Sequence, residues 1–442
     1  MDRRGALTLL AGAAATVAVG CGGAPPVRIA VVWSGWELSR FREVLGLPGA
    51  VVFSAGDNID ALLGGPVVPA AIPDMAIVPR GALVTDTAAV SQLRPVPASG
   101  PDAWQELLPA GPDGAKRGAW FKVAHKSLVW YRPEALPTSA RPAHWEDWVG
   151  WCKARARAGR PPLAIGAADG WMLTDWFENV LAGLDRGVYQ SLRDRTNLVA
   201  WSHVKVRDAL TRLANLWSIR GLMPGGGRRA LVTQFPDAVL DVFVHGRADM
   251  VAAPDFAWPV IAGHAPARAA GCGSDQRTAC RVERFRFPGP RHQPAPPVIA
   301  GGDVAVALTP AGVRAVRRLV GDGESAPPSP DDTVTRLERW AAKGGFLSLD
   351  PRVRYPRVLS GVAADLYEDF EFDLSDRLTG PLAGGDGRGL WRVLTDLFTA
   401  VTVDWDDGDA AAGDGAPEEV VTAAVNGAMD ALAALAGGSA GP

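Results

Sequence analysis

Five carboxylic acids in this chain are candidates for chemistry, and they are Asp169, Asp175, Glu178, Asp255 and Asp303. Two carboxyl groups at a suitable separation act as general acid and nucleophile in glycosidases. Carboxylates also bind sugar hydroxyls without reacting. The sequence has 16 Trp against 4 Tyr, and the wide apolar face of tryptophan stacks on the C–H face of a sugar ring. These residue types favour a carbohydrate ligand and leave binding and hydrolysis as alternatives.

Other kinds of chemistry are poorly supported. The sequence has no HExxH and no GxxxxGK[ST] motif, and its six histidines lack the spacing of metal ligands. Cys152, Cys272 and Cys280 show no CxxC spacing, so we expect no metal, no thiol chemistry and no cofactor. The charges are nearly balanced, with a formal net charge of −3, and they form no basic surface for nucleic acid.

Apolar runs alternate with helical segments in the first part of the chain. Residues 27–33, 50–53 and 75–78 read as buried strands, and residues 37–45 read as a helix between the first two. This alternation predicts a parallel α/β sheet. Ligands bind such sheets outside the carboxyl ends of the strands. Four residues at these ends are therefore candidate contacts: Trp33, Glu37, Asp57 and Arg80.

A second lobe is predicted to begin after residues 126–131, which read as one more strand followed by a proline-rich stretch to Pro142. Residues 169–181 enter a helix, with Trp171 before its first turn. The segment Gly225–Arg229 reads as a flexible linker. Residues 294–297 form a second proline-rich crossing, and repeated crossings between lobes allow hinge bending.

The N-terminus has the pattern of an export signal. A basic start, Met1 to Arg4, precedes the uncharged run 6–20, which is shorter than the ~20 apolar residues of a membrane span. Small residues then precede Cys21, as in a bacterial lipobox. We expect lipid on Cys21 and a tether at residues 22–26, and either the general or the twin-arginine route would fit the export signal.

Several segments together resemble a known family. They are Val31–Gly35, Lys126–Tyr131, Asp169–Asn179, Ala300–Val306, Gly344–Ser348 and Phe372–Asp376. In combination with the export signal, they resemble the sugar-type extracellular solute-binding proteins (family 1) of ABC importers. The resemblance implies a periplasmic-binding-protein-like α/β fold, in which two α/β lobes joined by a hinge enclose a ligand cleft.

The resemblance also implies the site and the partners. The expected ligand-binding residues are Trp33, Glu37, Asp57, Arg80, Lys126, Trp171, Asp175, Trp258 and Asp303. For Lys126 and Asp303, an ion pair or cap between the lobes is an equal alternative. Phe346 and Asp373 are assigned to structure, because such segments fix helix ends. The implied partners are a carbohydrate, the transmembrane subunits of an ABC permease and, through the lipid, the outer face of the cell membrane.

The expected organisation follows from these assignments. The signal covers residues 1–21, lobe 1 covers 27–134 and 297–345, and lobe 2 covers 135–296 and 346–403. A flexible acidic linker, 404–416, then leads to a last helix and tail, 417–442. The spacing of Cys272 and Cys280 would allow a local disulfide in an exported chain, and two free thiols are the alternative. We expect a monomer that is not an enzyme, and the alternatives are a secreted glycosidase-like enzyme or a receptor lipoprotein for a non-sugar solute or a sensor partner.

Overall fold

The structure is a computed structural model that describes residues 25–56, 59–64, 72–79, 81, 92–97, 100–194, 197–265, 281–321, 333–344, 346–378, 380–383, 389–403, 405 and 411–438. The predictions for Cys21, Asp57, Arg80 and the Cys272–Cys280 pair lie outside these residues.

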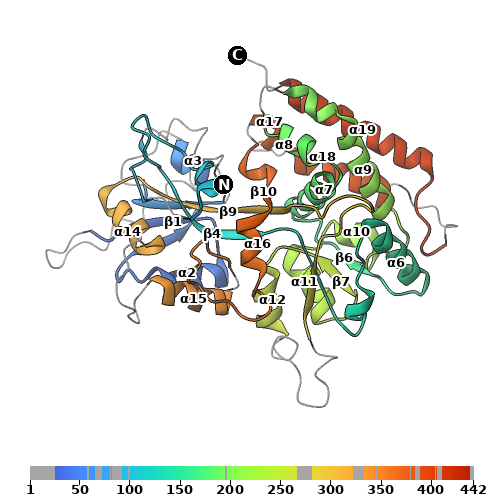
Figure 1. Ribbon diagram of the computed structural model, residues 1–442, viewed down its shortest axis with the longest axis horizontal. Helices are drawn as coiled ribbons and strands as arrows, with labels where there is room; N and C mark the ends of the chain where they lie inside the picture. Colours follow the sequence, from blue (N-terminus) through green and yellow to red (C-terminus); the bar gives the residue numbers. More distant parts are fainter. Residues whose placement is uncertain are drawn as a thin grey trace, which may run out of the picture.

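The first lobe is built on a mixed six-stranded sheet, drawn on the left of Figure 1. Its strands are β1 (Arg28–Val31), β2 (Val51–Ser54), β3 (Met75–Val78), β4 (Ala119–His125), β9 (Val298–Ala307) and β10 (Phe370–Phe372). β1, β2 and β3 are parallel, as the alternation of strands and helices predicts. β9, which returns from the second lobe, runs antiparallel to β3 and β4 and makes the sheet mixed.

The helices of the first lobe include α2 (Gly35–Leu45), α14 (Pro310–Val320) and α15 (Thr333–Gly344). Apolar side chains of these helices and of the strands form one buried cluster. It includes Phe41, Val316 and Trp340, which are at most 2% exposed. Burial of each such side chain contributes about 1.5–3 kcal/mol to the stability of the fold. The cluster therefore holds in place the end of β1, which directly precedes α2.

The second lobe surrounds a four-stranded sheet with the order β6-β7-β5-β8. Its strands are β5 (Leu128–Tyr131), β6 (Leu163–Ala164), β7 (Met250–Ala252) and β8 (Glu283–Arg286). Its helices include α6 (Trp145–Arg157), α7 (Trp171–Leu184), α9 (Val204–Trp217), α10 (Gly226–Ala230), α11 (Phe235–Phe243), α12 (Ala257–His264), α18 (Leu390–Thr402) and α19 (Glu418–Gly438). They occupy the right of Figure 1.

The chain crosses between the two lobes at three places. The first is Lys126-Ser127, between β4 and β5; the second lies between β8 and β9; and the third follows β10. Ile299 ties the first two together, because its amide donates to Ser127 Oγ at 2.8 Å and its carbonyl accepts from the Lys126 amide at 2.8 Å. These two hydrogen bonds hold the crossings side by side.

The sheets divide the chain differently from the expected organisation. Residues 126–131 are not one strand, because the chain leaves the first sheet after His125 and enters the second at Leu128. The first crossing therefore comes earlier than residue 134. β10 pairs with β9 in the first sheet, so residues 370–372 belong with the first lobe and not with the second.

One segment predicted to be flexible, and the described C-terminal part of another, are ordered and packed. Gly226–Ala230 forms α10, and residues 411–416 lie against the end of α9, where the Gly413 amide donates to the Arg220 carbonyl at 2.8 Å and the Ala416 amide donates to Ser218 Oγ at 3.1 Å. Both segments are rich in glycine, and this composition led to the prediction that they are flexible. The last helix is confirmed as α19. It is long and apolar enough to cross a membrane, but its buried residues pack in the core of the second lobe.

Candidate functional site

Lys122, on β4, lies at the centre of a group of residues that we call the Lys122 cluster. Its ammonium contacts the Glu37 carboxylate in the first turn of α2 and lies 3.9 Å from Asp303 Oδ2 on β9. It also lies 5.2 Å from the ring centroid of Trp33 and 5.7 Å from that of Phe256. Trp33, Glu37 and Asp303 belong to the first lobe, whereas Phe256 follows β7 in the second. One cation therefore joins the lobes where carboxylates and aromatic faces meet.

Trp33 is mainly a core residue. Its ring packs against Phe41, Phe121 and Trp340 at centroid distances of 5.1, 6.2 and 5.6 Å, and the residue is 7% exposed. Trp33 contributes to the site through the face of its ring that lies against the Lys122 ammonium. Glu37 is more accessible, because its side chain is 27% exposed. It is therefore the better placed of the two to meet a solute.

Three aromatic rings form the second-lobe side of this junction. Trp171, the first residue of α7, lies 5.4 Å from Phe235 and 5.7 Å from Phe256 between ring centroids, and the last two rings are 5.2 Å apart. Trp171 and Phe256 are half-buried. They present apolar surface beside the Lys122 ammonium. A sugar ring needs both, because its C–H faces pack on aromatic rings and its hydroxyl groups bind charged side chains.

Two neighbouring polar groups in the second lobe have no partner among the described residues. Asp255 is fully buried, and its Oδ1 accepts from the His125 amide at 2.6 Å, while its Oδ2 accepts nothing. Trp258 is 8% exposed, and its indole N–H donates to nothing. Buried polar groups are normally hydrogen-bonded. An acceptor just before α12 and a donor in its first turn are therefore left free, and a ligand or ordered water would satisfy them.

The charges of the Lys122 cluster are strongly coupled. Burial raises the pKa of Asp255 to about 7 and that of Asp303 to about 6, although Lys122 opposes both shifts. Burial would lower the pKa of Lys122, but Glu37 and Asp303 outweigh it and raise that pKa. Lys122 therefore stays charged, and Asp255 and Asp303 titrate at a higher pH than ordinary aspartates do.

Lys126 lies at the centre of a second group of residues, the Lys126 cluster, at the first crossing. Its ammonium lies 3.3 Å from Asp175 Oδ1 on α7 and contacts Asp373, which follows β10. The Asp373 carboxylate also accepts from the Asp376 amide at 2.8 Å and so caps the short helix at Leu374–Asp376, which confirms the structural role predicted for Asp373. A Cβ at Gly301 would collide with this carboxylate.

Two further acids complete the Lys126 cluster. Glu178 Oε2 accepts from Tyr189 Oη at 2.6 Å and from the Leu374 amide at 2.8 Å. Asp376 Oδ1 accepts from the Gly81 amide at 3.1 Å, which links the third crossing to the loop after β3. The cluster thus links the first and third chain crossings to each other. It also links both of them to α7 and to the first lobe.

Burial dominates the titration of the Lys126 cluster. It raises the pKa of Asp175 to about 7 and that of Glu178 to about 8, and it raises the pKa of Asp376 well above its usual range. Lys126 itself has a raised pKa, because Asp175 and Asp373 outweigh the effect of burial. One cation among four carboxyl groups leaves some of these groups protonated at neutral pH.

The structure sorts the predicted site residues into two groups. Trp33, Glu37, Asp303, Trp171 and Trp258 lie in or around the Lys122 cluster, and Lys126 and Asp175 lie in the Lys126 cluster. The contacts of Lys126 are those of the structural alternative that the sequence left open.

Sequence reasoning missed Lys122 and Phe256. A signal for Lys122 existed, because it is the one Lys, Arg, Asp or Glu in the apolar strand Ala119–His125. The sequence gave no corresponding signal for Phe256, because an aromatic residue in a loop most often packs against the core. Only the contact between Lys122 and Phe256 across the lobes brings these two residues into one site.

Comparisons with known proteins agree with this architecture, although no family model matches the chain. The osmoprotective compounds-binding protein GgtB of Synechocystis sp. is 24% identical over 393 residues, which cover 82% of this chain and 84% of that protein. The alpha-glucosides-binding periplasmic protein AglE of Rhizobium meliloti is 32% identical over 180 residues, or 34% of this chain and 38% of that protein.

A solved structure matches nearly the whole chain. The bacterial solute receptor AcbH, described as having an exclusive preference for β-D-galactopyranose, superimposes with a TM-score of 0.66 at 15% identity, covering 92% of this chain and 98% of that one. The fold is therefore that of the periplasmic-binding-protein-like receptors. The homologues of the chain are solute-binding proteins, which confirms the resemblance inferred from the sequence.

Proposed function

We propose that this protein is an extracytoplasmic receptor that captures a carbohydrate between its two lobes and delivers it to an ABC import permease. The observation that carries the proposal is the contact of the Lys122 ammonium with carboxylates and Trp33 of one lobe and with Phe256 of the other. Relatives that bind alpha-glucosides and osmoprotective compounds support the ligand class.

The chemistry of the junction suits a neutral sugar. Glu37 and Asp303 accept hydrogen bonds from hydroxyl groups, Lys122 and the free indole N–H of Trp258 donate, and the half-buried rings of Trp171 and Phe256 cover C–H faces. Closing the lobes on such a ligand removes water from these bonds, and an analogue that lacks a hydroxyl would leave one of these polar groups unpaired.

The remaining parts of the proposal concern delivery and location. A lipid on Cys21, with residues 22–26 as tether, would hold the receptor at the outer face of the cell membrane, where the permease would accept the sugar from a monomer. The relatives are periplasmic or extracytoplasmic proteins, which supports this location.

We also propose that binding occurs without catalysis. The homologues found are binding proteins, and three of the five candidate acids are held in the ion-pair or hydrogen-bond networks of the Lys126 cluster or beside Lys122. Sugar breakdown on incubation would instead support the glycosidase alternative.

Glu37→Gln tests the site directly. Loss of a charged acceptor for a sugar hydroxyl costs about 1.5–3 kcal/mol, so the affinity for whichever sugar binds the wild-type protein should fall about 10- to 100-fold in isothermal titration calorimetry. Glu43→Gln is the matched control, because Glu43 lies on the same helix with a side chain that is 53% exposed. Equal affinities of the wild type and Glu37→Gln, with an unchanged melting temperature, would remove Glu37 from the site.

A further inference from the structure

The Lys126 cluster contains four buried carboxyl groups and a single ammonium. Asp175 and Glu178 lie on α7, and Asp373 and Asp376 lie in the third crossing. All four residues are at most 6% exposed. If all of them were ionised, four negative charges would face the one positive charge of Lys126. Because a protein interior screens charges poorly, the cluster holds all of them ionised only at a high cost in free energy.

Three of the four carboxyl groups keep a buried oxygen that has no hydrogen-bond partner among the described residues. These oxygens are Asp175 Oδ2, Glu178 Oε1 and Asp376 Oδ2. The two acids of the third crossing lie close together, because a Cβ at Gly301 on β9 would crowd both Asp373 Oδ2 and Asp376 Oδ2. A buried carboxyl group without a counter-ion is more stable when it is protonated. The geometry of the cluster therefore favours the uptake of protons.

Three arginines near the cluster do not supply the missing counter-ions. Arg186 and Arg193 both contact the Glu371 carboxylate, which lies outside the cluster. Arg377 is near enough to Asp376 for their charges to interact, but it forms no ion pair with the described residues. The Lys126 ammonium therefore remains the central cation of the cluster.

The other elements around the cluster add no positive charge. α8 (Arg186–Ser191) contributes Tyr189, whose hydroxyl donates to Glu178 Oε2 at 2.6 Å, and burial raises the pKa of this hydroxyl, so it stays neutral. Burial and Asp373 raise the pKa of Asp376, and the negative charge of Asp303 on β9 adds to this shift. The buried residues of α9 and α18, which pack on α7, are apolar or aromatic.

A rise in pH adds negative charge to the cluster. Burial raises the pKa of Asp175 to about 7 and that of Glu178 to about 8. The folded protein therefore holds protons on these two acids at lower pH and releases them between about pH 6 and pH 9. Lys126 stays charged, because Asp175 and Asp373 outweigh burial and raise its pKa. The carboxylates formed on α7 then face those of the third crossing, and like charges in a buried site repel one another.

The two sides of the cluster belong to different lobes. The third crossing is fixed to the first lobe, because β10 pairs with β9 and the Asp376 carboxylate accepts from the Gly81 amide at 3.1 Å. α7 is fixed in the second lobe, where the ring of Trp176 stacks on that of Trp148 at a centroid distance of 5.3 Å. Repulsion across the cluster therefore acts between the lobes.

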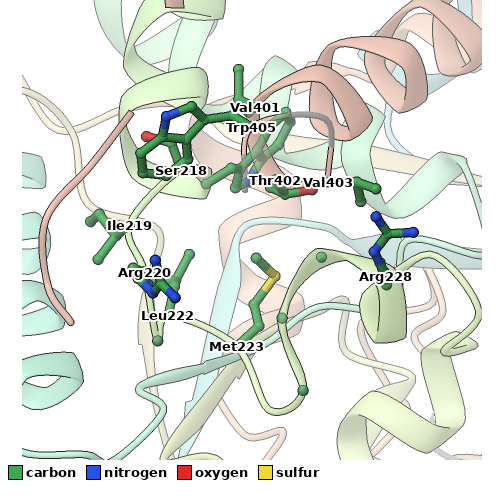
Figure 2. Close-up of a pocket in the computed structure, with 15 residues that line it drawn as sticks. Ser218, Ile219, Arg220, Leu222, Met223, Arg228, Val401, Thr402, Val403 and Trp405 are labelled. Atoms are coloured by element: carbon green, nitrogen blue, oxygen red, sulfur yellow. The ribbon is translucent and has the colours of Figure 1, made fainter. Parts of the chain in front are cut away.

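The helices around α7 are packed together, so that the second lobe moves as one body. α7 packs against both α9 and α18. The rings of Trp217 on α9 and Phe398 on α18 are 5.3 Å apart between centroids. The ends of these two helices meet the turn into α10 around a cavity (Figure 2), and a Cβ at Gly227 would collide there with Thr402. A displacement of α7 therefore carries the rest of the lobe with it.

We propose that the Lys126 cluster is a proton-sensitive switch at the hinge between the lobes. In its protonated form, the cluster holds α7 against the third crossing. When it loses protons, repulsion between the carboxylates separates α7 from the third crossing, and the lobes open. The inference concerns the protein without ligand, so its test and that of the proposed function fail independently.

Small-angle X-ray scattering of the full-length protein without ligand tests the switch. Between pH 6 and pH 8.5, the radius of gyration should increase by on the order of 1 Å from the roughly 22 Å of a compact chain of this length. The increase should reverse when the pH returns to 6. Far-ultraviolet circular dichroism of the same samples shows whether the protein stays folded. A radius that does not change over this range, or unfolding without an earlier increase in radius, would overturn the proposal.

Two variants show whether the cluster causes the change in radius. Glu178→Gln should reduce the increase, and Asp175→Asn combined with Glu178→Gln should abolish it, because the amides resemble the protonated acids and do not titrate. Glu419→Gln, an exposed change in the first turn of α19, is the matched control and should keep the full increase. An equal increase in the wild type and the double variant would place the cause outside the cluster and contradict the proposal.

Discussion

Replacing Lys126 with methionine is expected to lower the free energy of unfolding by about 3–5 kcal/mol. The substitution keeps most of the side-chain volume and removes the ammonium that contacts Asp373 and Asp175. Both carboxyl groups would stay buried without their counter-ion, and the junction of the crossings would lose its central contact. Urea denaturation at pH 7, followed by circular dichroism, measures the change.

Lys343→Met is the matched control for Lys126→Met. Lys343 lies at the end of α15 with a side chain that is 57% exposed, and its ammonium is 3.8 Å from Glu43. Exposed pairs of this kind contribute about 0–1 kcal/mol. If both lysine variants lost the same small amount of stability, the Lys126 cluster would not be the contact that holds the chain crossings together.

Glu178→Gln is expected to leave stability nearly unchanged at pH 5 and to raise it at pH 9, relative to wild type, by on the order of 5 kcal/mol. Burial raises the pKa of Glu178 to about 8, so the folded protein holds a proton there that the unfolded chain releases near pH 4.5. Between these two values the folded state binds more protons, and the contribution of Glu178 to stability falls as pH rises. Glutamine resembles the protonated acid and does not titrate.

Thermal unfolding at pH 5, 7 and 9 measures this effect as the difference in melting temperature between variant and wild type. Taking the difference removes the titration of other groups. Glu419→Gln, an exposed change in the first turn of α19, should give a difference that is independent of pH. A pH-independent difference for Glu178→Gln as well would show that Glu178 is ionised throughout.

The strands and helices that flank the site were predictable because their burial is local. The apolar run before Trp33 and the helix from Glu37 follow from periodicity alone, and both occur in the structure. The break at Lys126-Ser127 was not predictable in this way. Residues 119–131 are apolar on both sides of it, and only the pairing of β4 with β9 and of β5 with β7 shows that they belong to different lobes.

The site was predictable only in part, because some of its residues are identified by local sequence and others by long-range contacts. Strand ends identified Trp33 and Glu37, whereas the role of Lys126 depends on Asp373, which lies 247 positions further along the chain. Glycine content was also misleading. Gly227 suggests flexibility in the sequence, but it permits the close contact between α10 and Thr402. Long-range contacts of these kinds leave little trace in a single sequence.

The central claim is that the protein binds a carbohydrate and does not break it down. Titration calorimetry of the protein lacking residues 1–21, with galactose, maltose, trehalose, raffinose and glycine betaine, tests it most directly, with each sugar analysed for breakdown after overnight incubation. The account predicts saturable binding of at least one sugar, weakened by Glu37→Gln, and no product. Binding of glycine betaine alone, or the appearance of hydrolysed sugar, would contradict it.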